Sequence, residues 1–220
     1  MHLHPSTQGN LAIVQTRGGS YGGQATVGID TRAGKVLWKD VTNAYGVGAV
    51  FARNGELVVE ADQFMSPQTT NGWLICREAK TGERLWEYRL DGLIHHAPLV
   101  DATSDFVYAI FSRGEVVCLN ARDGKLIWTK RLPENSLEGV ALSYDPAWSP
   151  HSVQGDHLLV VDCNNVLHRI RASSGKIQTE VLLTSSPGET LVGAPGILGE
   201  RLIVPLNTGV SAYAWPPGSP

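Results

Sequence analysis

"NARDGKLIW", at residues 120–128, decides the fold of this chain because two close copies of it lie upstream. The copies read "EAKTGERLW" at residues 78–86 and "DTRAGKVLW" at residues 30–38. Each stretch places a glycine four residues before a tryptophan, and two weaker copies follow. Recurrence of this kind predicts an internal repeat rather than an isolated hairpin.

Two independent marks give the same repeat length. The aligned glycines are 48, 42, 51 and 43 residues apart, at Gly34, Gly82, Gly124, Gly175 and Gly218. A second slot, which is proline in four of five copies, has steps of 45, 48, 52 and 45, at Pro5, Val50, Pro98, Pro150 and Pro195. A period of about 46 residues is typical of propellers or helical arrays.

The residues between these marks favour strands over helices. Runs such as "ELVVEA", "FVYAIF" and "HLLVVD" are short and rich in β-branched or aromatic residues, and no segment sustains a helical period. Each unit therefore reads as four antiparallel strands, which is one propeller blade. We predict an all-β propeller segment over residues 1–220, with about four and a half blades in an incomplete ring. The predicted blades are 1–42, 43–91, 92–133, 140–184 and 189–220.

The repeated glycine and tryptophan are predicted to be structural. The glycine belongs to a tight turn between the third and fourth strands, where a residue at positive φ is needed. The tryptophan lies in the outer strand, where a large ring can fill the gap between neighbouring blades. The residues given this structural role are Gly34, Trp38, Gly82, Trp86, Gly124, Trp128 and Gly175, and the three tryptophans are expected to be largely buried.

Composition excludes several classes of protein. The 220 residues carry a net charge of −3, so no basic footprint for nucleic acid is present. No run of 18 apolar residues predicts a membrane-spanning helix, and the N-terminal residues do not read as a signal peptide. The three cysteines are 42 and 45 residues apart, at Cys76, Cys118 and Cys163, which is not a zinc-binding or disulfide pattern. We expect no bound metal.

The stretch "GIDTRAGKVLW" resembles the repeat of the quinoprotein (PQQ-like) β-propellers, whose pattern is AxDxxxGxxxW. "CREAKTGERLW" and "CLNARDGKLIW" are similar to it, whereas "RIRASSGKIQT" has Arg171 in the acidic slot and Thr179 in the tryptophan slot. One class of this family is the dehydrogenases that bind pyrroloquinoline quinone (PQQ) and calcium in an eight-bladed ring. The other class is non-catalytic, and includes the propeller lipoprotein of the outer-membrane β-barrel assembly machinery.

The resemblance implies a non-catalytic scaffold. Family dehydrogenases stack the quinone against adjacent cysteines, which this chain lacks, and eight blades would need about 370 residues. We therefore expect no catalytic residue and no cofactor, and a partner that is a protein or the remaining blades of a parent chain. One alternative is a fragment of a PQQ-dependent dehydrogenase, and another is the sensor domain of a larger receptor or kinase. The family resemblance implies a location outside the cytoplasm, such as the periplasm, if the chain is a fragment.

Histidines gather beside the proline slot, which lies in the innermost strand of each predicted blade. Alternate residues of that strand face the central channel, so His4, His95, His96 and His151 are candidate channel-lining residues. A ring of imidazoles can bind a metal or titrate near neutral pH. The alternative is that they are polar residues facing channel water, and two blades have Ala49 and Ala194 at the matching place.

The fifth unit lacks an outer strand. Its third strand is followed by "WPPGSP", and proline cannot donate to a strand ladder. Only four residues precede Pro5, which is too few to supply that strand from the other end of the chain. We therefore predict two exposed edges that pair with another chain or with further blades.

Overall fold

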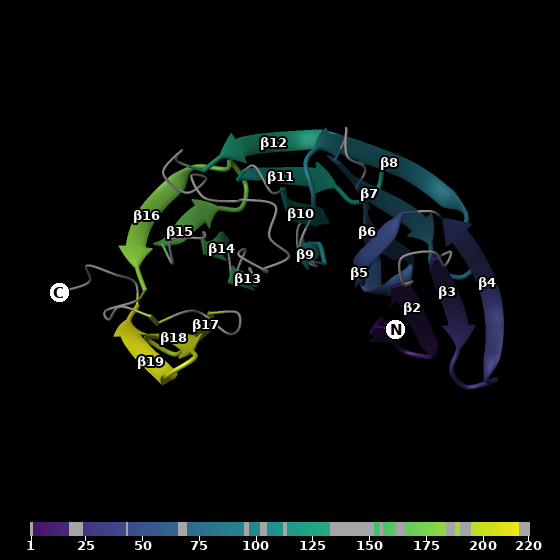
Figure 1. Cartoon of the computed structure of the whole chain (residues 1–220), viewed down its shortest axis with the longest axis horizontal. Helices are drawn as coiled ribbons and strands as arrows, with labels where there is room; N and C mark the ends of the chain where they lie inside the picture. The colour runs from purple at the N-terminus through teal and green to yellow at the C-terminus, as the bar shows by residue number, and fades with distance from the viewer. Residues whose placement is uncertain are drawn as a thin grey trace. The chain divides into compact units, whose positions relative to one another are not determined.

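A computed structural model describes residues 2–17, 24–42, 44–65, 70–94, 97–101, 105–111, 114–132, 152–154, 156–161, 166–183, 188–189 and 195–215 (Figure 1). The chain divides into two compact units, Met1–Thr129 and Lys130–Pro220, with the division inside the last strand of the third sheet. The prediction of four-stranded antiparallel sheets is confirmed. Four sheets have four strands each, and the fifth has three among the described residues.

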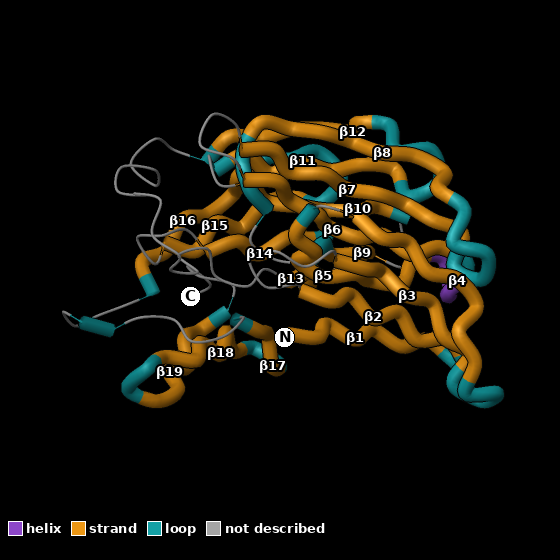
Figure 2. Tube along the Cα trace, turned by 45° about the vertical axis from the view of Figure 1, so that its right-hand side comes forward, coloured by secondary structure: helices purple, strands orange, loops and turns teal. Residues whose placement is uncertain are grey.

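The first unit contains three antiparallel sheets whose strands follow chain order (Figure 2). The first sheet is formed by β1 (His2–Gln8), β2 (Leu11–Arg17), β3 (Gln24–Asp30) and β4 (Lys35–Thr42). The second has β5 (Tyr45–Ala52), a 3₁₀ turn (Arg53–Gly55), β6 (Leu57–Met65), β7 (Thr70–Glu78) and β8 (Arg84–Asp91). The third has β9 (Leu99–Asp101), β10 (Phe106–Phe111), β11 (Glu115–Asn120) and β12 (Leu126–Arg131). Figure 1 shows β4, β8 and β12 along the outer side of this unit.

The second unit contains the fourth and fifth sheets. The fourth is formed by β13 (Ser152–Gln154), β14 (His157–Val161), β15 (Val166–Arg171) and β16 (Ile177–Leu182). The fifth is formed by β17 (Gly196–Leu198), β18 (Arg201–Leu206) and β19 (Gly209–Ala214).

One backbone hydrogen bond recurs in all five sheets. The residue after the acidic slot of the repeat donates its N–H to the carbonyl of the turn between the first two strands, at 2.7–2.9 Å. The pairs are Thr31 to Asn10, Ala79 to Glu56, Ala121 to Asp105, Ala172 to Asp156 and Trp215 to Glu200. Trp215 therefore holds the same position in the fifth sheet that Thr31 holds in the first.

The acidic slot and the glycine build the turn before the outer strand. Asp30 Oδ1 accepts hydrogen bonds from the N–H groups of Arg32 and Ala33, both at 2.9 Å, and this side-chain cap favours the turn. The four turn glycines, Gly34, Gly82, Gly124 and Gly175, have φ of 64°, 75°, 67° and 67°. These values lie in the left-handed region, which glycine adopts without a Cβ clash.

The tryptophans of the first two blades each bind the turn of the next blade. The indole Nε1 of Trp38 donates to Ala79 O in the second sheet, and that of Trp86 donates to Ala121 O in the third, both at 2.9 Å. A Cβ on Gly82 would lie 2.5 Å from the Trp38 ring, and a Cβ on Gly124 would lie 2.7 Å from the Trp86 ring. The glycine is therefore required for inter-sheet contact as well as for the turn.

Trp38, Trp86 and Trp128 are half-buried, less than the large burial expected from the sequence. For Trp38 and Trp86 the physical reason lies in the contact itself. The indole rests on a glycine turn, and a glycine covers less of the ring than a larger side chain would.

The outer strands contain a β-bulge that period-two alternation did not predict. The register between β3 and β4 shifts so that Gly28 faces Trp38 and Ile29 faces Val36, which leaves Leu37 as the extra residue. The shift recurs between β7 and β8 at Leu85, and between β15 and β16 at Gln178. A bulge redirects the neighbouring side chains, and here the extra residue directly precedes the tryptophan slot.

Apolar residues fill the space between most neighbouring sheets. The largest cluster joins the second and third sheets through residues such as Leu74, Cys76, Val117 and Leu119. The fourth and fifth sheets share a second cluster, which includes Leu159, Leu167, Leu202 and Val204. Between the first and second sheets the apolar cluster is small, with Ile13, Ala49, Val58 and Ala79. Polar groups occupy the rest of that interface.

Candidate functional site

The histidines singled out by the sequence are not placed by the structure. His95, His96 and His151 lie outside the described residues, and His4 lies in β1 with a side chain that is also outside them. The channel-lining role of these four residues stays a prediction.

Instead, the described residues bring buried ionisable side chains together between the first and second sheets. We name this group the inter-blade polar cluster, and its members are Gln15, Thr26, Asp40, Glu60, Asp62 and Arg77. Gln15, Thr26, Glu60, Asp62 and Arg77 are all buried, and Glu60 is completely so. Such burial is rare for charged residues unless they are paired.

Strand alternation places the cluster. Glu60 and Asp62 are two residues apart on β6, so they share the face that Val58 presents to the first sheet. Thr26 on β3 pairs with Gln15 on β2 and with Asp40 on β4. These three side chains therefore lie on one face of the first sheet, the face that contacts the second sheet. In the sequence, "ELVVEAD" places acidic residues in an otherwise apolar strand, which is a signal for such a cluster. The pattern does not reveal which sheet packs against these acids.

Arg77 joins the two sheets at the centre of the cluster. Its Nε donates to Glu60 Oε1 at 2.6 Å and its Nη1 donates to Gly82 O at 3.1 Å. Its Nη2 donates to Asp40 of the first sheet. The guanidinium carbon also lies 5.9 Å from the centroid of the Trp38 ring. Arg77 thus bonds two carboxylates and a carbonyl from both sheets, and the cluster binds the sheets to each other.

Gln15 connects the two acids of β6. Its Nε2 lies 3.1 Å from Asp62 Oδ1, 3.3 Å from Glu60 Oε2 and 3.4 Å from Thr26 Oγ1. The side-chain amide of Gln15 has only two N–H protons, so it cannot donate a full hydrogen bond to all three acceptors. The amide of Gln15 packs on Gly46, where a Cβ would lie 3.1 Å from Gln15 Cδ.

Burial, and after it the nearby Glu60 carboxylate, raises the pKa of Asp62 from 3.8 to about 7, while Arg77 and Arg84 oppose the shift. Arg77 bonds Glu60 and Asp40 rather than Asp62. The cluster forms ion pairs between the two sheets.

The described cysteines do not fit a stacked quinone. Cys76 and Cys118 are completely buried, and they lie on β7 and β11 of different sheets. Burial raises the pKa of each thiol to about 12. Cys76 Sγ lies 3.7 Å from Ala121 O, the carbonyl that also accepts from Trp86. Both thiols are packed in the interior of their sheets.

Other site types gain no support in the part of the chain that the structure describes. No three histidine, cysteine or acidic side chains gather there as a metal would require. Within the same residues, no helix is long and apolar enough to span a membrane. A hollow of about 470 Å³ opens to solvent beside the turns of the first two sheets, and its lining includes Asp30, Leu37 and Lys80. The Asp30 carboxylate is already used as the turn cap.

The outer strands expose apolar side chains at one repeated position. Leu37, Leu85 and Ile127 each directly precede the blade tryptophan, and they are 41%, 46% and 42% exposed. Val36 and Leu126, one residue earlier, are 54% and 47% exposed. Three successive sheets of one unit therefore present the same uncovered apolar position at the β-bulge or its equivalent.

Comparison with known proteins agrees with this architecture. A family model described as outer membrane protein assembly factor BamB matches residues 2–140 and 112–214. The chain is similar to the solved structure of the Dos1 propeller, with a TM-score of 0.69 and 10% sequence identity over 93% of this chain. It spans 50% of that propeller chain, and the likeness shows the fold alone. No curated protein matches the sequence.

In the strong copies, Asp30 and Asn120 cap their turns, and Trp38 and Trp86 each contact the following sheet. Two overlapping matches together cover nearly the whole chain. The chain therefore belongs to the PQQ-like β-propeller repeat family of the outer membrane protein assembly factor BamB.

Proposed function

We propose that this propeller is a non-catalytic scaffold that binds a protein segment along its outer strands. The observation that carries the proposal is the repeated exposed position of Leu37, Leu85 and Ile127. Exposed apolar side chains that recur on one side of a protein mark interaction surfaces. The description of the family as an assembly factor also supports a role in binding proteins.

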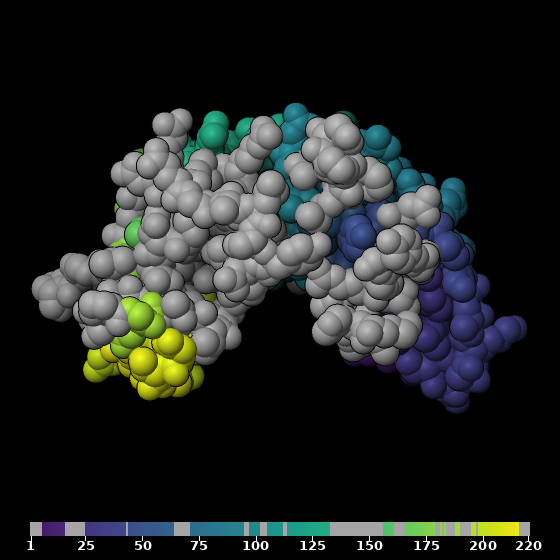
Figure 3. All heavy atoms as spheres, in the orientation of Figure 1, coloured from purple at the N-terminus to yellow at the C-terminus, as the bar shows by residue number. Residues whose placement is uncertain are grey.

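The form of this surface favours a protein over a small molecule. Small ligands are held in concave pockets that bury most of their surface. The three positions instead lie on outer strands, and Figure 3 shows β8 and β12, in blue to teal, uncovered along the margin of the first unit. A partner that reaches several blades must be an extended segment.

Charge indicates the composition of that partner. Lys35 and Lys39 flank Leu37 on β4, and neither forms an ion pair with any described residue. Lys125 precedes Leu126 and is exposed, and its one ion pair is with Asp123 on the same turn. A segment that alternates apolar and acidic residues would complement this margin.

Selection of random peptides displayed on phage against the 220-residue chain tests the proposal. We expect enriched peptides with apolar and acidic residues, and we expect the variant L37S/L85S/I127S to lose at least about tenfold in affinity for them. The matched control is L198S, which changes a more exposed apolar residue outside this row. Circular dichroism checks that each variant keeps its strands.

If no peptide is enriched, or if the triple variant binds the peptides as tightly as the wild type, the proposed binding surface on the outer strands is rejected. Reduction of a redox dye by the chain in the presence of PQQ and calcium would instead favour the dehydrogenase alternative.

A further inference from the structure

The hollow of about 470 Å³ beside the turns of the first two sheets adjoins the row of exposed apolar residues on the outer strands. Leu37 belongs to both features, because it lines the hollow and is also the first member of the row. Leu11 of β2 is a second apolar residue of the lining. A protein segment bound along the row would therefore pass the mouth of this hollow.

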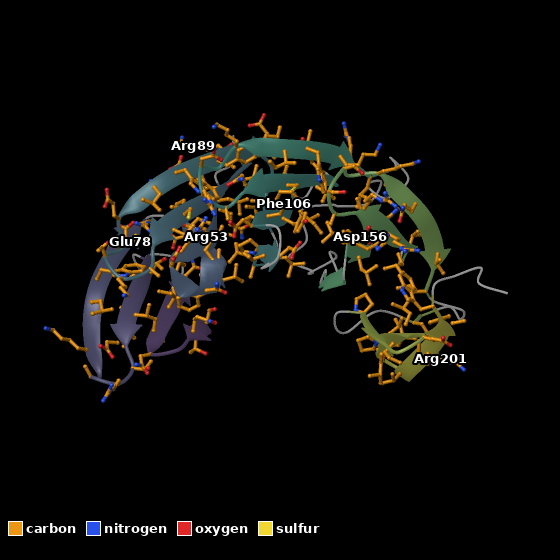
Figure 4. All side chains as sticks on the ribbon, turned by 180° about the vertical axis from the view of Figure 1, so that it is seen from behind. Arg53, Glu78, Arg89, Phe106, Asp156 and Arg201 are labelled. Carbon is orange, nitrogen blue, oxygen red and sulfur yellow. The ribbon has the colours of Figure 1, made fainter. Side chains whose placement is uncertain are left out.

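Between the second and third sheets, ion pairs connect the equivalent turns. Arg53, labelled in Figure 4, follows β5 and donates from Nη1 to Asp105 Oδ2 of the third sheet at 3.2 Å. Arg122 Nε, from the turn before β12, donates to the same oxygen at 3.2 Å. One carboxylate thus binds a cation from each of the two sheets.

The contact between the first and second sheets lacks this arrangement. Gly9 directly follows β1, as Arg53 directly follows β5, and a Cβ on Gly9 would meet nothing within 4 Å. Glu56 holds the position of Asp105, since both carbonyls accept the recurring backbone hydrogen bond, but the Glu56 carboxylate pairs with Arg53 of its own turn at 3.2 Å. The space that a side chain crosses in the next pair of sheets is therefore open here.

Lys80 is the cation at this hollow. Lys80 and Arg122 are equivalent, because each lies two residues after the acidic slot of its repeat. Arg122 pairs with Asp105, whereas Lys80 is exposed and forms no ion pair with any described residue. The Asp30 carboxylate also lines the hollow, but its Oδ1 already accepts two backbone N–H groups. Lys80 is therefore available to a carboxylate from outside the chain.

We propose that this hollow anchors the segment bound along the outer strands by accepting one acidic side chain of that segment. The carboxylate pairs with Lys80, while the aliphatic stem packs on Leu11 and Leu37. A stem long enough for both contacts favours glutamate over aspartate. Because the equivalent Arg122 is already paired, the anchor fixes the register of the segment on the blades. This inference rests on the proposed scaffold function and adds to it the side chain that specifies binding.

The peptides enriched by selection against the unaltered 220-residue chain are the probe, and fluorescence anisotropy measures their affinity. Lys80→Ala is expected to weaken binding about fivefold, the upper range for an ion pair at a surface. Arg122→Ala is the matched control, because it removes the equivalent cation of the third sheet and should leave the affinity unchanged. Circular dichroism and melting verify that both variants fold.

A double-mutant cycle identifies the anchor in the peptide. Each acidic residue of the peptide is replaced in turn by its amide, and one replacement should cost about fivefold against the unaltered chain but nothing against Lys80→Ala. Charge reversal sharpens the test, because Lys80→Glu should prefer a peptide with lysine at that position over the original peptide.

Two results would overturn the anchor while the scaffold function stands. One is a set of peptides that depends on Leu37, Leu85 and Ile127 but has no acidic position coupled to Lys80. The other is an equal loss of affinity in Lys80→Ala and Arg122→Ala. If no peptide is enriched, the anchor and the scaffold function are both rejected.

Discussion

At the scale of single residues, the repeat motif is a set of contacts between neighbouring blades. The acid caps the turn, the glycine lets the turn adopt positive φ, and the indole of the preceding blade rests on that glycine and bonds the next carbonyl. The sequence predicted the turn and a packing role for the tryptophan. It did not predict that the glycine of one blade receives the tryptophan of the blade before it, because that pairing depends on how sheets stack.

Alanine at two turn glycines separates the two roles of this residue. Gly34 and Gly124 have φ of 64° and 67°, but a Cβ would meet nothing within 4 Å at Gly34, whereas it would clash with the Trp86 ring at Gly124. Gly34→Ala should cost about 1 kcal/mol for the backbone alone. Gly124→Ala should cost roughly 2–4 kcal/mol because overpacking adds to the same backbone term. Urea unfolding measures both, and equal losses would show that the ring contact adds nothing.

The raised pKa of Asp62 gives a second test at this scale. The folded state keeps a proton on Asp62 up to a pKa of about 7, whereas the unfolded state releases it near 3.8. The free energy of unfolding must therefore fall as the pH rises between these values, and it stays lowered above them. Asp62→Asn should flatten this dependence and stabilise the chain by roughly 1–4 kcal/mol at about pH 8.

Unfolding in urea at about pH 5 and about pH 8 measures the effect, with Glu83→Gln on an exposed turn as the control. A variant that loses as much stability as the wild type between these two pH values would show that Asp62 is not the source of the pH dependence.

At the scale of elements, the strands were predictable and their irregularities were not. Short β-branched runs and repeated turns indicated four strands a blade, and the sheets contain them. Strict alternation, however, cannot reveal the extra residue at Leu37, Leu85 and Gln178, because a bulge is fixed by pairing with the neighbouring strand. The inter-blade polar cluster escaped prediction for a similar reason, since its members come from five strands of two sheets.

Deletion of Leu85 tests the bulge as an element. Without the extra residue, Trp86 and Arg84 could still pair with Cys76 and Arg77, but the bulge that directs the indole toward Gly124 and the carbonyl of Ala121 would be lost. We expect the deletion to destabilise the chain by more than about 3 kcal/mol, whereas Leu85→Ala should change stability by less than about 1 kcal/mol because the side chain is exposed. Thermal unfolding compares the two variants, and similar melting temperatures would mean that the bulge does not position the tryptophan.

At the scale of the whole molecule, the period of the repeat was sufficient to predict a propeller made of four-stranded sheets. The function could not be predicted to the same extent, because the motif residues serve packing between blades and do not indicate a ligand. The structure adds a surface that sequence patterns do not mark, the apolar margin of the outer strands.

Calorimetric titration of the 220-residue chain with PQQ in the presence of calcium tests the non-catalytic account most directly. The account predicts no saturable heat, because the described thiols are buried in separate sheets and the ionisable cluster is bonded between blades. Saturable binding with a micromolar dissociation constant would contradict it.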